Sequence, residues 1–224
     1  MDSIYFITGI DTDAGKTIIT GAMGRYLLSK GVKVITQKLA QTGCAGMSED
    51  ILSHRSLMKI DLLSEDYEAL TCPYVFEFPS SPHLAANREG QSINPDLLDA
   101  ATNELRNRFE CVLVEGVGGL MVPLNSELNL VDYLKHCDYP IILVTSGKIG
   151  SINHTLLTLE VCASKGLKVV GLVFNHFAST NDVITADTLN VFRNKLKDYF
   201  PAAKMVEVPI LDESSEVVDF SELF

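Results

Sequence analysis

The residues with the clearest chemical meaning form a glycine-rich loop near the amino end of the chain. The loop reads Gly9-Ile10-Asp11-Thr12-Asp13-Ala14-Gly15-Lys16-Thr17, and it follows the apolar run Ile4–Ile7. Backbone N–H groups that turn into a helix attract anions, a lysine there reaches terminal phosphates, and the following hydroxyl can hold Mg²⁺. The usual pattern has four residues between its glycines, and this loop has five between Gly9 and Gly15. We therefore expect a nucleotide-binding loop, with a plain structural turn as the alternative.

A second candidate lies where another apolar run ends in an acid. Residues 111–114 are Cys-Val-Leu-Val, and Glu115 and the glycine-rich segment Gly116–Gly119 follow them. In an open α/β sheet the ligand binds beyond the carboxyl ends of the strands, which would place Glu115 beside the phosphate loop. Its carboxylate could there bind Mg²⁺ or water. The glycines would let the backbone approach phosphates closely, or would simply form a tight turn.

Two further charged residues could act in the same crevice. Lys38 follows the predicted strand Val32–Gln37, and a lysine there would match the negative charge that spreads during phosphoryl transfer. Asp50 stands near a predicted helix start in Ser48–Ile51 and could be a second metal ligand. The alternatives are a solvated lysine and an acid that complements the helix dipole.

These candidates need a sheet that brings strand ends together, and the pattern of apolar runs predicts one. Six short runs are separated mostly by helix-length segments: Ile4–Ile7, Val32–Ile35, Cys111–Val114, Pro140–Val144, Val169–Phe174 and Met205–Val208. Successive apolar residues within a run indicate a strand that is buried on both faces. We therefore expect an α/β fold of the P-loop NTPase type. It would have a doubly wound, mostly parallel sheet with helices on both faces, in a single domain over residues 1–224.

Helix ends are marked by capping residues, glycine and proline. The predicted helices are Lys16–Lys30, Pro95–Arg108, Ser151–Lys165 and one within Asn181–Phe200. Gly31 and Gly166 follow the first and third of these helices, and Asn94 offers an N-cap to the second. Between the second strand and residue 95 we expect loops and short helices. The acidic segment Asp212–Phe224 is interpreted as a solvated tail.

The composition limits the kinds of partner. The chain has 29 acidic and 18 basic residues and a formal net charge of −11, which disfavours nucleic acid or an anionic membrane as a partner. No stretch approaches the roughly 20 apolar residues that span a bilayer, and no signal core follows a basic amino end. Five scattered cysteines without a C-x-x-C pair indicate neither a disulfide framework nor a zinc site. We expect a soluble, cytoplasmic protein that acts on small molecules.

Taken together, the ordered motifs resemble those of the dethiobiotin synthetases, the ATP-dependent ligases of biotin synthesis. The motifs that carry the resemblance are Thr8–Thr17, Gln37-Lys38, Ser81-Pro82-His83, Val114–Gly119, Gly150–His154 and Phe174-Asn175. The phosphate loop of this family has the longer gap, so the spacing supports the resemblance. Leu39 and Thr42 stand where many members have proline and serine, and Thr42 keeps the hydroxyl.

The resemblance implies a homodimer that makes a cyclic urea from 7,8-diaminopelargonate, CO₂ and ATP, with Mg²⁺ and with substrate near the interface. It implies two catalytic residues, Lys16 on the phosphates and Lys38 on the carbamate. The metal ligands would be Thr17, Asp50 and Glu115, with Glu49 in place of Asp50 if the loop aligns differently. ATP would contact Asp13, Ala14, Gly15, Lys16, Thr17, Ile18, Asp50, Glu115, Gly116, Val117, Gly118, Asn175, His176, Pro209, Ile210 and Leu211. The other substrate would contact Thr42, Ser81, Ile149, Gly150, Ser151 and Asn153.

Other proteins of the same fold class are the alternatives. Partitioning and septum-positioning ATPases carry a signature lysine early in the phosphate loop, where this chain has Ile10, Asp11 and Thr12. Cobyrinate and cobyric acid synthases continue into a glutaminase domain, which we do not expect beyond Phe224. A regulatory nucleotide-binding module without catalysis stays open.

Overall fold

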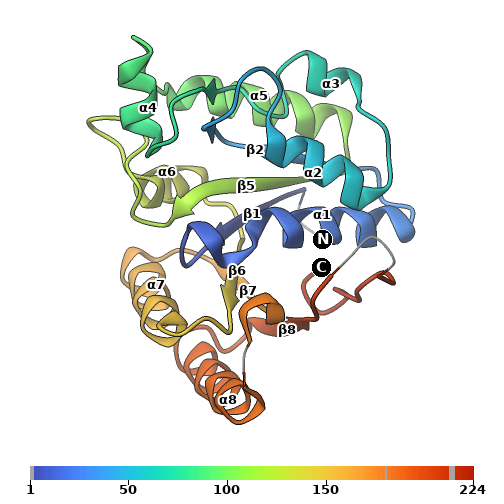
Figure 1. Cartoon of the computed structure of the whole chain (residues 1–224), viewed down its shortest axis with the longest axis vertical. Helices are drawn as coiled ribbons and strands as arrows, with labels where there is room; N and C mark the ends of the chain where they lie inside the picture. Colours follow the sequence, from blue (N-terminus) through green and yellow to red (C-terminus); the bar gives the residue numbers. More distant parts are fainter. Residues whose placement is uncertain (1–2, 180, 212–214) are drawn as a thin grey trace.

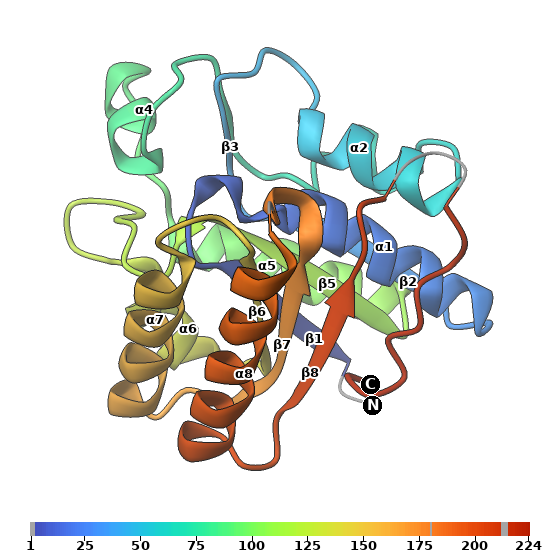
Figure 2. The same cartoon turned by 60° about the horizontal axis from the view of Figure 1, so that its bottom comes forward.

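A six-stranded parallel sheet forms the centre of the computed structural model, which describes residues 3–179, 181–211 and 215–224 (Figures 1 and 2). The strands lie in the order β2-β5-β1-β6-β7-β8, and each neighbouring pair is parallel. Their bounds are Ile4–Gly9 (β1), Val34–Lys38 (β2), Cys111–Gly119 (β5), Ile141–Ser146 (β6), Val169–Asn175 (β7) and Lys204–Val208 (β8). The six predicted strands and the parallel sheet are therefore confirmed.

Alternate residues of the strands pack on opposite faces of this sheet. In β1, Ile4 and Phe6 join one buried cluster, and Tyr5 and Ile7 join the other. The first cluster contains side chains of α5 (Pro95–Arg108), α6 (Leu130–Cys137), α7 (Ser151–Lys165) and α8 (Asp182–Tyr199). The second contains side chains of α1 (Lys16–Ser29). Because helices cover both faces, the strands need apolar residues at successive positions.

The long helices begin and end close to the predicted residues. Helices α5 and α7 have the predicted bounds, and α1 ends one residue before its predicted end. Helix α8 lies within the predicted range Asn181–Phe200. Helix α6 was not among the predicted helices, because its eight residues give only a short periodic pattern. No helix in the described ranges is long and apolar enough to cross a membrane.

Between β2 and α5 the chain forms short elements, as expected. They are β3 (Gln41–Thr42), α2 (Glu49–Met58), α3 (Ser64–Tyr67), β4 (Val75–Phe76) and α4 (Pro82–Arg88). Strands β3 and β4 pair in parallel as a second sheet, which the sequence did not predict. The Ser48 hydroxyl caps α2 by accepting a hydrogen bond from Ile51 N–H at 3.2 Å. This cap fixes where α2, the helix that carries Asp50, begins.

Helix α2 packs against α1 through two glycines of α1. A Cβ added at Gly21 would lie 2.7 Å from Leu57 Cδ1, and one added at Gly24 would lie 2.8 Å from Met58 Sδ. Both distances are too short for contacts between carbon or sulfur atoms. Glycine at these positions therefore lets the two helices approach more closely than alanine would.

The carboxyl-terminal residues pack on the face of the sheet that α1 also covers. Phe220 and Leu223 are buried, and the ring of Phe224 meets that of Tyr5 edge-on at 4.9 Å between centroids. The interpretation of Asp212–Phe224 as a solvated tail is therefore wrong for residues 215–224, and residues 212–214 lie outside the described residues. Burial of the aromatic rings decides the position of residues 215–224, and the side chains of Glu216, Asp219 and Glu222 remain at the surface.

The direction of winding reverses at β1, which lies between β5 and β6. All strands end at the same edge, and Lys38 on β2 is the register partner of Glu115 on β5. A doubly wound sheet forms its ligand crevice where the winding reverses. The loop that follows β1 lies at this point, together with the ends of β2, β5, β6 and β7.

Candidate active site

The phosphate loop turns from β1 into α1 through a single left-handed glycine. Gly15 has φ 90°, and an added Cβ would lie 2.1 Å from Asn175 Nδ2. The same Asn175 amide donates to the Ala14 carbonyl at 3.3 Å, so the end of β7 supports the loop. Because α1 begins without a side-chain cap, its first N–H groups are available to an anion.

Lys16 is buried at the start of α1. Its ammonium donates to the carbonyls of Asp11 at 2.9 Å and Thr12 at 3.3 Å. Burial, and then the positive charge of Lys38, lower the pKa of Lys16 to about 8. Lys16 and Lys38 therefore repel each other, and an anion bound between them would relieve this repulsion.

Lys38 lies between two carboxylates. Its Nζ is 2.6 Å from Glu115 Oε1 and 2.5 Å from Asp50 Oδ2. Burial alone would lower the pKa of Lys38, but the two carboxylates raise it to about 12. Burial alone would raise the pKa of Glu115, but Lys38 and then His54 hold it well below its usual range. Lys38 and Glu115 are thus both charged in the folded protein, and Lys38 is a fixed cation at the end of β2.

Two more side chains complete the contacts of Glu115. The Thr17 hydroxyl donates to Glu115 Oε1 at 3.0 Å, and His54 Nε2 lies 2.8 Å from Oε2. His54 was not predicted from the sequence. Its spacing of four residues from Asp50 on one helix face is the signal that could have found it.

The oxygen atoms at this point fit a Mg²⁺ ion that travels with a nucleotide. Carboxylates of Glu115 and Asp50 surround one cation, Lys38 Nζ, and the Thr17 hydroxyl lies against the same Glu115 oxygen. Within the described ranges no cluster of three or more His, Cys, Asp or Glu side chains could hold a metal. Mg²⁺ commonly uses only one or two carboxylates, with water and phosphate oxygens as its other ligands. Glu49, the alternative ligand, is exposed.

A cavity of about 670 Å³ lies over the phosphate loop. Its lining residues are Thr12, Asp13, Gly15, Lys16, Thr17, Ile18, Lys148, Asn175, Phe177 and Leu211. Seven of the predicted ATP contacts, Lys16 among them, thus line one space large enough for a nucleotide. Phe177 and Lys148 were not predicted, and only their places after β7 and β6 could have indicated them.

Other predicted ATP contacts lie at the margin of this cavity or away from it. Pro209 and Ile210 are exposed on the segment that leads to Leu211. His176 Nε2 lies 3.1 Å from a carboxylate oxygen of Glu207.

The predicted contacts Gly116, Val117 and Gly118 lie near the end of β5. A Cβ added at Gly116 would lie 2.9 Å from the Phe6 ring. Close packing on Phe6 is thus a structural reason for glycine at position 116.

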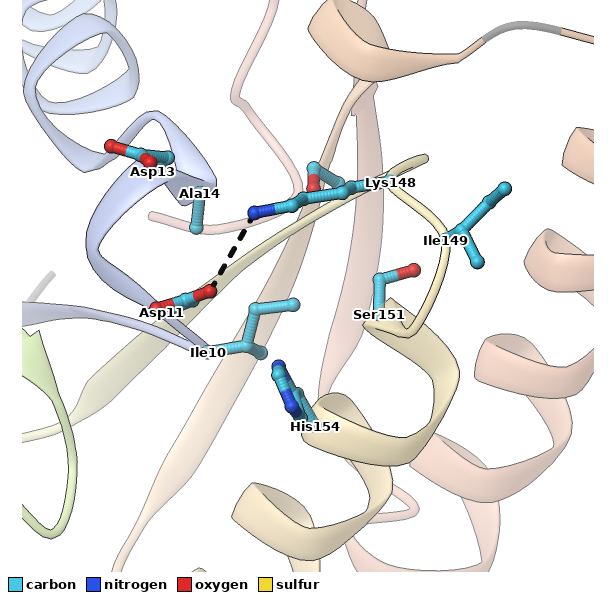
Figure 3. Close-up of a pocket in the computed structure, with 9 residues that line it drawn as sticks. Ile10, Asp11, Asp13, Ala14, Lys148, Ile149, Ser151 and His154 are labelled. Atoms are coloured by element: carbon cyan, nitrogen blue, oxygen red, sulfur yellow. Dashed lines mark ion pairs between the residues drawn. The ribbon is translucent and has the colours of Figure 1, made fainter.

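A second, smaller cavity of about 50 Å³ separates the phosphate loop from the start of α7 (Figure 3). Lys148 reaches across it from the loop after β6, with Nζ 3.9 Å from Asp11 Oδ2. Ile149, which is 87% exposed, and Ser151 line the same space, and Gly150 has φ 94° between them. Asn153 is exposed on the first turn of α7.

The remaining predicted substrate contacts come from the short elements after β2. Thr42 is half-buried in β3, and Ser81 is half-buried at the start of α4. Figure 2 shows β3 and α4 beyond the same edge of the sheet as the phosphate loop. The predicted substrate residues therefore lie on two sides of that loop, one set in β3 and at the N-cap of α4, and the other around the start of α7.

The chain is similar to known proteins in sequence and in fold. A family model described as an AAA domain matches residues 3–217. The ATP-dependent dethiobiotin synthetase BioD 2 of Pasteurella multocida is 49% identical over 201 residues, which cover 90% of this chain and 94% of that protein. The ATP-dependent dethiobiotin synthetase BioD of Chlorobaculum tepidum is 45% identical over 221 residues, which cover 98% of this chain and 92% of that protein. A solved ParA family ATPase from Chlorobium tepidum has a TM-score of 0.54 and 14% identity, over 95% of this chain and 87% of that chain.

A phosphate loop at the point where a parallel sheet reverses its winding defines a P-loop nucleotide-binding protein of the α/β class. The likeness to the ParA ATPase supports this fold and carries nothing about activity. At the sequence identities given above, the chain belongs to the family of ATP-dependent dethiobiotin synthetases.

Proposed function

We propose that the protein is an ATP-dependent ligase that closes the ureido ring of dethiobiotin from 7,8-diaminopelargonate and CO₂. The observation that carries this proposal is the buried Lys38, held between Glu115 and Asp50 beside the phosphate loop. A cation fixed there matches the charge that spreads over a transferring phosphoryl group. The names of the two relatives, which match nearly the whole chain, support the same activity.

The reaction needs no nucleophile from the protein. One amine of the diamine adds to CO₂, which forms a C–N bond, releases a proton and gives a carbamate. A carbamate oxygen then attacks the γ-phosphorus of ATP, and ADP leaves. The second amine attacks the carbonyl carbon of this mixed anhydride, loses a proton and closes the ring as phosphate leaves. The protein has to position small charged reactants and neutralise their charge.

The two catalytic lysines would act on different reactants. Lys16, at the start of α1, would bind the phosphates of ATP together with the N–H groups of the loop. Lys38 would bind the carbamate and stabilise the phosphoryl group as it moves to the carbamate oxygen. Its pKa of about 12 supports this task, because Lys38 then stays charged throughout the reaction.

Thr17, Asp50 and Glu115 would hold the Mg²⁺ that accompanies ATP. Their support is that Asp50 and Glu115 both contact Lys38 Nζ, and that the Thr17 hydroxyl contacts the same Glu115 oxygen. When bound, the ion neutralises phosphate charge and helps to orient the phosphates.

The large cavity would hold the nucleotide. Asp13, Ala14, Gly15, Ile18, Gly116, Val117 and Gly118 would contact its phosphates, and Asn175, His176, Pro209, Ile210 and Leu211 would contact its base. The other substrate would lie between Thr42 and Ser81 on one side and Ile149, Gly150, Ser151 and Asn153 on the other. The lining of the cavity by Gly15, Asn175 and Leu211 supports the nucleotide position.

A homodimer would place the substrate near the subunit interface. Met121, Ile149 and Leu157 are more than half exposed, at 56%, 87% and 57%. Exposed apolar side chains of this size commonly mark an interaction surface, and Met121 and Leu157 line one hollow of about 420 Å³. We also propose that the protein works in the cytoplasm, which its five free cysteines support.

One assay tests the proposed function. Purified protein with ATP, Mg²⁺ and bicarbonate is expected to release ADP only when 7,8-diaminopelargonate is added, with dethiobiotin formed in equal amount. ADP release that is independent of the diamine would instead indicate an ATPase switch. Nucleotide binding without ADP release under either condition would indicate a regulatory module.

A further inference from the structure

His54 has a contact that the proposed reaction does not by itself require. It lies one turn after Asp50 on α2, its side chain is fully buried, and its Nε2 is 2.8 Å from Glu115 Oε2. Lys38 Nζ lies 2.6 Å from the other oxygen of the Glu115 carboxylate. A carboxylate only accepts hydrogen bonds, so the hydrogen of this contact belongs to His54 Nε2.

The two oxygens of Glu115 therefore have separate partners. Oε2 accepts from His54, whereas Oε1 faces Lys38 and the Thr17 hydroxyl of the phosphate loop. One oxygen is thus anchored away from the loop and the other is turned toward it. A carboxylate held at one oxygen keeps its orientation when the contacts of the other oxygen change.

The helix that carries the imidazole, α2, is itself held in place by buried hydrogen bonds. The neighbouring Arg55 donates to Asp66 at 2.9 and 2.7 Å and to the Thr36 hydroxyl at 2.7 Å. These buried bonds tie α2 to β2 and α3. The helix therefore carries both Asp50 and the side chain that orients Glu115.

We propose that His54 is a positioning residue that fixes Glu115 so that Oε1 is presented to the Mg²⁺ of the bound nucleotide. The inference rests on the proposed function, since it concerns a metal ligand of the nucleotide site. It assigns His54 no contact with substrate and no proton transfer. Its role is to keep a buried carboxylate in one orientation.

Substitutions of His54 that remove or restore the hydrogen-bond donor distinguish this role from simple packing. His54→Met fills a similar volume without a donor, and His54→Gln places an amide N–H at about the distance of Nε2 from the backbone. The probe is Mn²⁺ titrated into protein with the non-hydrolysable analogue AMP-PCP, with free Mn²⁺ measured by electron paramagnetic resonance. His54→Met is expected to weaken Mn²⁺ binding by about 10- to 100-fold, as losses of supporting hydrogen bonds at metal ligands do, and His54→Gln to recover most of it. Should the methionine variant not fold, His54→Asn, whose amide is too short to reach Oε2, replaces it with the same expected loss.

Ile51→Val is the matched control, since Ile51 is buried on the same helix. It is expected to lower stability by about 0.5–1.5 kcal/mol and leave Mn²⁺ binding unchanged. In turnover assays His54→Met should raise the Mg²⁺ concentration for half-maximal rate more than it lowers kcat at saturating Mg²⁺.

Equal Mn²⁺ affinity in wild type and His54→Met would overturn the inference about His54 and leave the proposed function standing. Wild-type protein that binds Mn²⁺ with AMP-PCP, shows the His54 effect and makes no dethiobiotin would overturn the proposed function alone.

Discussion

Lys38 Nζ and Glu115 Oε1 lie 2.6 Å apart, on side chains that are register partners of neighbouring strands. Both residues are buried, so neither charge can turn to solvent when the other is removed. Loss of one partner of a buried ion pair costs far more than loss of an exposed one. The pair therefore joins catalytic capacity to the stability of the sheet edge.

Lys38→Met is expected to lower turnover by about 100-fold or more, because the developing phosphoryl charge loses its fixed cation. In Mg²⁺-free buffer the same change should lower the free energy of unfolding by about 3–5 kcal/mol, since it leaves the buried Glu115 carboxylate without its cation. Urea unfolding and diamine-dependent ADP release measure the two effects. Lys135→Met, an exposed lysine of α6, is the control. Near-normal turnover in folded Lys38→Met would contradict the assigned role.

Gly15→Ala is expected to weaken nucleotide binding by about tenfold or more, since strain of about 1–3 kcal/mol falls on the phosphate loop. The new Cβ would lie 2.1 Å from Asn175 Nδ2, at a residue with φ 90°. Calorimetry with AMP-PCP measures the affinity. Gly31→Ala is a matched control, with φ 79° and nothing within 4 Å of its added Cβ. If both variants bind nucleotide as the wild type does, the steric argument fails.

The pH dependence of stability should change in Asp66→Asn. Burial alone would raise the pKa of Asp66, but hydrogen bonds from Arg55, Leu63 N–H and Thr71 lower it below its ordinary value. The unfolded chain then binds more protons than the folded one near the usual aspartate pKa of about 3.9. Asp66 therefore stabilises the fold above that pH, and this contribution is lost as the pH falls through the lower, folded value.

We expect Asp66→Asn to be less stable than wild type by about 3–5 kcal/mol at pH 7, because it leaves Arg55 unpaired. The difference should shrink as the pH is lowered below about 4. Urea unfolding between pH 3 and 7 measures it, with exposed Asp61→Asn as the control. A difference that is constant over this range would show that the carboxylate charge of Asp66 does not stabilise the fold.

Phe220→Ala is expected to lower the free energy of unfolding by about 3–5 kcal/mol, because the ring is fully buried against α1. AMP-PCP affinity should stay unchanged, because the ring packs on the core rather than on the nucleotide cavity. Val217→Ala, at a 41% exposed position of the same segment, is the control. Equal stability of the two variants would mean that the segment leaves the sheet in solution.

The sequence predicted the strands and long helices well, because two buried faces give apolar runs and because glycine and proline mark helix ends. It could not predict β3 and β4, whose pairs join residues 41–42 to 75–76 without any local signal. The interpretation of the last residues as a solvated tail was wrong, because it relied on the number of acidic residues in 212–224. It did not consider where Phe220 and Leu223 could pack.

In the candidate site, Lys38 and Glu115 could be predicted because each stands at the end of a strand that the sequence predicts. The sequence left Glu49 as an alternative to Asp50 for the metal ligand. The two acids differ only in the direction in which their side chains leave α2: Asp50 contacts Lys38, and Glu49 is exposed. His54 was missed for the same reason, since its role depends on which strand α2 faces. A residue that acts through another residue leaves little trace in a motif.

The close contact of α1 with α2 at Gly21 and Gly24 has a consequence for inhibition. The two helices carry Thr17 and Asp50, so the spacing between the helices also sets the spacing between two proposed metal ligands. A compound that wedges α2 away from α1, on the side remote from the phosphate loop, would separate these ligands without entering the nucleotide cavity. Such a compound would inhibit without competing with ATP, and its binding site would be the glycine face itself.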